Sequence, residues 1–146
     1  IAWLMGYHSK TSTAIRETRL PYAQCAQRDT DESRFLHGGD LAPTYQTWFQ
    51  ITNLHVWLLT TRYRALPKTH GRRYVQELVN HFFIDVEHRM RVTLSNKAPE
   101  RVVKGYMREM RDQWAGAGIA LDLGLIGSDA ELSGAVWRNV FAARGL

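Results

Sequence analysis

Two prolines, Pro43 and Pro67, enclose an apolar segment near the middle of the chain. The segment reads TYQTWFQITNLHVWLLTTRYRAL and has no charged residue between Thr44 and Thr61. Proline is favoured at the first position of a helix, and it pushes the residue before it out of the helical region. The two prolines therefore predict a single helix from Pro43 to about Leu66.

This central helix is too short and too polar to cross a membrane. Its uncharged run of about 16 residues falls short of the roughly 20 that a membrane span needs, and it contains Gln50, Asn53 and His55. When the residues are plotted at about 100° each, the apolar ones cover more than half of the circumference. A helix with so wide an apolar arc packs against several neighbours, so we expect it at the centre of a bundle.

The rest of the chain also shows helical patterns, and the alternating pattern of strands is absent from the sequence. Ser128 and Glu131 have the spacing of a capping box, and Gly145 is a typical helix stop. The polar sequence RDTDESRFLHGGDLAP indicates a loop. We therefore predict an all-α protein, an irregular bundle of about five helices. Besides the central helix, we expect helices over residues 68–94, 99–121, 128–145 and, with a weaker pattern, within 1–27.

Length and composition set only broad limits on function. A chain of 146 residues is expected to form one domain, and its start at Ile1 rather than methionine suggests a fragment of a longer protein. The single cysteine, Cys25, excludes an internal disulfide framework and suits a reducing compartment. The formal net charge of +5 is compatible with RNA, anionic lipid or an acidic partner.

Trp57 is unusual because it lies in the middle of the polar arc of the central helix. One explanation is that another helix covers it, since tryptophan is usually well buried. The other is that it anchors a protein interface, where tryptophan and arginine are enriched. We predict that Trp57 or its neighbours on the polar arc lie at a contact surface.

The sequence HFFIDVEHR, in the helix expected at 68–94, is the best candidate for chemistry. His81, Asp85 and His88 follow one another at spacings of four and three, so they share one side of the helix. Together with His55 they could bind a metal in a metal-dependent enzyme. Helical di-iron sites, however, need such a motif on two helices, and no second Glu-x-x-His occurs. We predict instead that His81 and Asp85 are a structural polar pair bonded to neighbours such as Arg89 or His55, and we expect no metal and no cofactor.

Basic residues are densest where the two long central helices meet. No acidic residue occurs between Asp40 and Glu77 to neutralise them. A solvated turn is one explanation; the other is contact with RNA or anionic lipid, as in a plain RNA-binding helical module. We predict that these residues bind phosphate, and we name them the basic turn: Arg62, Arg64, Lys68, Arg72 and Arg73.

Three separate motifs occur along the chain. They are Trp48-Phe49 followed by His55-Val56-Trp57, then His81-Phe82-x-x-Asp85-Val86, then Val136-Trp137-Arg138 followed by Phe141. In this order they closely resemble the ubiquinol–cytochrome c chaperone family, the cytochrome b assembly chaperones of respiratory complex III. The resemblance covers about residues 10–144, and the sequence RALPKTHG is most like that of fungal members.

The resemblance implies an assembly factor that is not an enzyme. Family members act in mitochondria at the matrix face of the inner membrane, where they pair with a small helical partner protein. The pair binds the mitochondrial ribosome near its tunnel exit and receives newly made cytochrome b. For this chain the resemblance implies that the basic turn meets ribosomal RNA, with peripheral contact to the inner membrane as a further option. The residues that it implies for partner or client binding are Trp48, Phe49, Trp57, Trp137 and Arg138.

Overall fold

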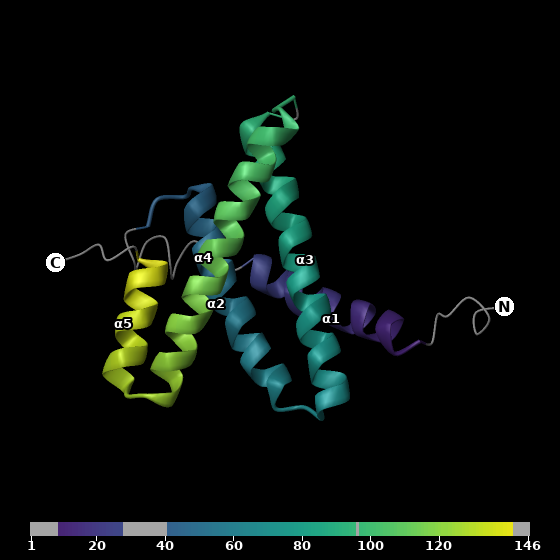
Figure 1. Cartoon of the computed structure of the whole chain (residues 1–146), viewed down its shortest axis with the longest axis vertical. Helices are drawn as coiled ribbons and strands as arrows, with labels where there is room; N and C mark the ends of the chain where they lie inside the picture. Colours follow the sequence, from purple (N-terminus) through teal and green to yellow (C-terminus); the bar gives the residue numbers. More distant parts are fainter. Residues whose placement is uncertain (1–8, 28–40, 96, 142–146) are drawn as a thin grey trace.

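The computed structural model describes residues 9–27, 41–95 and 97–141, and within them every regular element is an α-helix (Figure 1). This confirms the predicted all-α class. The helices are α1 (Lys10–Ala26), α2 (Tyr45–Arg64), α3 (Lys68–Leu94), α4 (Glu100–Ile126) and α5 (Asp129–Val140).

Helices α2 to α5 run alternately down and up, and α1 crosses them at a steep angle (Figure 1). The turn between α2 and α3 and the turn between α4 and α5 therefore lie at the same end of the bundle. Helix α2 packs against α1, α3 and α5, which is the central position expected from its wide apolar arc. Among the described residues, no helix has the combination of length and hydropathy that a membrane crossing requires.

The main core is aromatic and lies between α1, α2, α3 and the first half of α4. Phe82 of α3 is its centre: the side chain is fully buried, and its ring centre lies 5.4 Å from that of Phe49 and 6.4 Å from that of Trp48. Methionines of α4, Met107 and Met110, cover the far side of this cluster. Aromatic pairs at these distances stabilise a core beyond the area that they bury.

Local signals set most of the helix boundaries. The hydroxyl of Thr44 accepts a hydrogen bond from the backbone N–H of Thr47 at 3.2 Å and so caps α2. At α5 the predicted capping box is present, because Ser128 Oγ accepts from the backbone of Glu131 and Glu131 Oε2 accepts from the backbone of Ser128. The expected loop over 28–43 lies largely outside the described residues. Helix α5 ends at Val140 with Phe141 as its C-cap, which is earlier than the expected end near Gly145.

Helix α4 is longer than predicted. Its predicted end is at about Leu121, since the glycines in the sequence GLIGSDAEL that follows are typical of a turn. In the structure it continues to Ile126, and Gly124 lies inside it. A Cβ atom on Gly124 would lie 2.7 Å from the Cα of Leu132. This glycine therefore allows the backbone of α5 to pack directly on α4.

Candidate functional site

Trp57 lies beneath α4 and α5 rather than at the surface. Its side chain is only 6% exposed and packs against Leu121 and Ala135. The indole Nε1 donates a hydrogen bond to Asp122 Oδ1 at 2.8 Å. Trp57 itself is therefore enclosed by this chain's own helices, and a contact surface at its neighbours on the polar arc stays a prediction. The neighbouring helices cover the residue, which is the other explanation that the sequence left open.

Trp48 and Phe49 are core residues, 3% and 1% exposed. The indole Nε1 of Trp48 donates a hydrogen bond to the carbonyl of Ala26 at 3.3 Å, and the guanidinium of Arg89 lies over its ring, 4.3 Å from the centre. A partner can reach these two side chains only if the bundle opens. Their implied role in partner or client binding stays a prediction.

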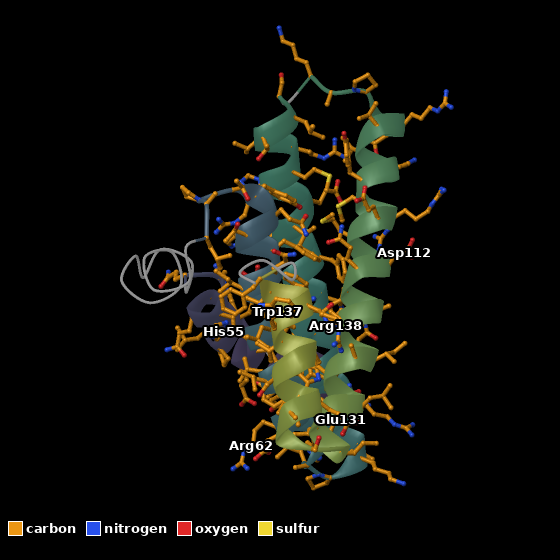
Figure 2. The ribbon with its side chains drawn as sticks, turned by 90° about the vertical axis from the view of Figure 1, so that its left-hand side faces the viewer. His55, Arg62, Asp112, Glu131, Trp137 and Arg138 are labelled. Atoms are coloured by element: carbon orange, nitrogen blue, oxygen red, sulfur yellow. The ribbon has the colours of Figure 1, made fainter. Side chains whose placement is uncertain are left out.

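Trp137 and Arg138 are on α5 (Figure 2). Trp137 is half-buried, whereas Arg138 is exposed. Figure 2 shows Arg138 on the side of α5 that faces α4. Of the five residues that the resemblance implied for partner or client binding, Arg138 is thus the most accessible.

His81 and Asp85 both connect α3 to α1. The hydroxyl of Tyr22 donates to Asp85 Oδ2 at 2.6 Å, and Arg89 Nε donates to Asp85 Oδ1 at 3.1 Å. His81 Nε2 lies 3.0 Å from the carbonyl oxygen of Ile15. Because a carbonyl can only accept, His81 Nε2 is the donor in this bond. Each residue therefore makes a bond from α3 to α1, and their role as a structural polar pair stays a prediction.

The surroundings of Asp85 keep Tyr22 in its neutral form. Burial and the hydrogen bond to Asp85 raise the pKa of the Tyr22 hydroxyl above its usual value. His55, which the sequence analysis grouped with this site, instead has its Nδ1 2.8 Å from the carbonyl oxygen of Ile51 in α2. Within the described part of the chain, no three His, Cys, Asp or Glu side chains come together as metal ligands would.

The basic turn lies at the lower end of the bundle in Figure 1, where α2 passes into α3. Gly71 allows the two helix ends to approach each other closely, because a Cβ atom there would lie 2.5 Å from the carbonyl oxygen of Tyr63. All five basic side chains are exposed. This close approach gathers the cations of the end of α2 and of the start of α3 into one group.

One member of the basic turn is not free. Arg64 Nη1 lies 2.8 Å from Asp122 Oδ2, so an acid of α4 neutralises it although the nearby sequence contains none. Burial raises the pKa of Asp122, but hydrogen bonds from Arg64 and Trp57 together outweigh it and leave that pKa below its usual value. The other four cations make no ion pair with a described residue: Arg62, Lys68, Arg72 and Arg73.

The sequence analysis missed an apolar stripe on α4. Ile119, Leu123 and Ile126 recur at spacings of four and three, and all three side chains are exposed, Ile126 by 81%. Residues at these spacings lie on one face of a helix. The pattern was visible in the sequence, but the predicted end of the helix at Leu121 hid it.

Fold and surface together define a class of protein: a helical bundle with a cationic end and an exposed apolar helix face. The family follows from comparison with known proteins. The chain belongs to the ubiquinol–cytochrome c chaperone family, because the family model described as "Ubiquinol-cytochrome C chaperone" matches residues 39–145. This confirms the resemblance seen in the three sequence motifs.

Several proteins with curated names are similar to the chain. "Protein CBP3, mitochondrial" of Saccharomyces cerevisiae is 40% identical over 104 residues, which is 71% of this chain and 31% of that protein. "Ubiquinol-cytochrome c reductase complex assembly factor 1" of Mus musculus is 31% identical over 134 residues, 92% of this chain and 43% of that protein. The chain thus spans less than half of either relative. No solved structure gives a significant match.

Proposed function

We propose that this chain is a chaperone domain for the assembly of respiratory complex III and acts by binding rather than by catalysis. The family match covers α2 to α5, and the relatives are named as mitochondrial or as complex III assembly factors. In this proposal the domain works at the matrix face of the mitochondrial inner membrane. There, with a small helical partner, it receives newly made cytochrome b at the ribosome.

The observation that carries the ribosome contact is a group of four cations of the basic turn that pair with no described acid: Arg62, Lys68, Arg72 and Arg73. They lie at one end of the bundle, and Asp122, an acid that α4 brings to this end, is already engaged by Arg64 and Trp57. Cations that are held together sum their fields, and the sum attracts phosphate more strongly than any single charge does. Ribosomal RNA is the phosphate source that we propose.

The apolar stripe on α4 supports contact with a helical protein. An exposed row of Ile119, Leu123 and Ile126 is a surface onto which the apolar face of another helix can pack. The stripe ends at the same end of the bundle as the basic turn (Figure 1). We propose that the small helical partner packs here, which leaves the basic turn free for the ribosome.

Charge reversal tests the ribosome contact. The test variant is Arg62→Glu, Lys68→Glu and Arg72→Glu, and the control is Arg101→Glu, Lys104→Glu and Arg108→Glu. The control residues are exposed, lie toward the opposite end of the bundle and make no ion pair with a described residue. Both variants change the net charge equally. Co-sedimentation with mitochondrial ribosomes at two salt concentrations should show loss of binding in the test variant alone.

A plain RNA-binding module is the second candidate, because the same cations would serve it. That module would bind naked RNA without a protein partner, with an affinity that falls steeply as salt rises. An RNA-binding assay with and without ribosomal protein separates the two proposals. Equal binding of naked RNA and of ribosomes would favour the module.

A further inference from the structure

A small polar recess opens between α2, α4 and α5, away from the basic turn. Its volume is about 210 Å³. None of the described residues that line it is acidic. The polar side chains and the glycine that matter here are Gln50 and Asn53 of α2, Gln113 and Gly116 of α4, and Arg138 and Asn139 of α5.

Asn53 is the most buried polar residue among those that line this recess. The residue is only 6% exposed, yet its side-chain amide makes no hydrogen bond with any described residue. Its amide atoms are not among the fully buried polar atoms that lack a partner, a set that within the described residues contains Thr52 Oγ1 alone. The Asn53 amide is therefore open to water, which a polar ligand can replace as its hydrogen-bond partner. Asn53 lines the recess, which is therefore the place from which a partner can reach it.

The neighbours of Asn53 add one cation and further amides, and each amide offers N–H donors as well as an acceptor oxygen. The amide nitrogen of Asn139 already donates to the carbonyl of Ala135 at 2.8 Å. Arg138 makes no ion pair with a described residue, and its Nη1 lies over Gly134, 3.3 Å from where a Cβ would be. Gln50 is partly buried and its amide is unbonded within the described chain. Gln113 already bonds Gln46 at 2.8 Å. The free groups facing the recess are thus one guanidinium and two amides.

We propose that this recess binds a carboxylate group. A carboxylate has two acceptor oxygens that match a guanidinium and amide N–H donors, and such charge-assisted bonds are stronger than neutral ones. One cation with neutral amides suits a single negative charge better than the double charge of phosphate. The carboxylate comes either from an Asp or Glu side chain of another polypeptide or from a free small carboxylate. The proposal uses none of the basic turn, so it stands apart from the ribosome contact.

Gly116 provides a way to close the recess without disturbing the fold. A Cβ atom there would meet nothing within 4 Å, so no packing in the described chain requires a glycine. Glycine is also unfavourable inside a helix. Gly118, two residues further along α4, has the same open space but does not line the recess. Gly116→Leu and Gly118→Leu are therefore a matched pair.

The experiment is an NMR titration of the ¹⁵N-labelled protein at constant ionic strength, following the side-chain resonances of Asn53, Gln50 and Arg138. The probes are N-acetyl-glutamate N-methylamide, the neutral glutamine analogue, acetate and inorganic phosphate. We expect saturable shifts with the glutamate probe and none with the glutamine probe. Tighter binding of the glutamate probe than of acetate indicates a polypeptide source; equal binding indicates a free carboxylate.

The variants decide whether binding occurs in the recess. Gly116→Leu should abolish the shifts, whereas Gly118→Leu should bind as wild type does. Arg138→Gln, at an exposed position, should weaken binding about tenfold, because it removes one charge-assisted hydrogen bond. Equal binding of the glutamine probe, shifts with phosphate alone, or wild-type binding by Gly116→Leu would overturn the proposal.

Discussion

Two glycines of α4 should respond in opposite directions to the same substitution. Gly118 has open space where a Cβ would lie, whereas a Cβ on Gly124 would lie 2.7 Å from the Cα of Leu132 in α5. Alanine is favoured over glycine inside a helix by about 0.8–1 kcal/mol. We therefore expect Gly118→Ala to raise the free energy of unfolding by about that amount.

Gly124→Ala makes the same gain in helix propensity but also forces two backbones apart. Overpacking of this kind costs about 1–3 kcal/mol, and contact with a backbone atom, which no side-chain rotation relieves, favours the upper part of that range. The net result should be a loss of about 1–2 kcal/mol. The difference in free energy of unfolding between the two variants measures the effect of the close packing of α4 on α5.

Urea unfolding followed by circular dichroism measures both variants. The urea midpoint of Gly118→Ala should lie above that of wild type and the midpoint of Gly124→Ala below it. The slope of the free energy of unfolding against urea concentration should be the same in all three proteins. If Gly124→Ala were as stabilising as Gly118→Ala, the two helices would not approach each other closely at Gly124. Gly124 would then not be required for the packing of α5 on α4.

Three further variants test side-chain contacts between helices. Trp57→Ala should lower the free energy of unfolding by about 3–5 kcal/mol, since it empties a buried site; an unchanged thermal midpoint would contradict its burial. Tyr22→Phe should cost about 1–3 kcal/mol, because Asp85 loses a partly buried donor, and urea unfolding at neutral pH measures it. Because the pKa of Asp122 is lowered in the folded state, its contribution to stability is present above its unfolded pKa and is lost as pH falls through the folded value. The free energy of unfolding of Asp122→Asn, measured across acidic pH, should therefore fall less than that of wild type. An equal fall in both proteins would contradict a stabilising role of the Asp122 carboxylate.

The helices could be predicted because their signals are local. The prolines around α2 and the capping box at Ser128 act within a few residues, and the structure places helix ends close to each. The end of α4 could not be predicted in the same way. Gly124 resembles a turn residue, and only the approach of Leu132 shows that it is a contact between helices.

The candidate site depended more on contacts between distant parts of the chain. Trp57 looked exposed because its hydrogen-bond partner, Asp122, comes from α4 and could not be paired with it by spacing. The same acid removes Arg64 from the set of free cations. The other four cations of the basic turn could be predicted to form a group, because they lie close together in the sequence.

Site-specific crosslinking tests the proposed docking of the basic turn on ribosomal RNA. A photo-reactive residue at position 72 reports on the basic turn, and one at position 101 is the control at the opposite end of the bundle (Figure 1). After illumination of isolated mitochondria, position 72 should crosslink to ribosomal RNA and position 101 should not. Crosslinks from position 72 only to lipid, or equal RNA crosslinks from both positions, would contradict the proposal.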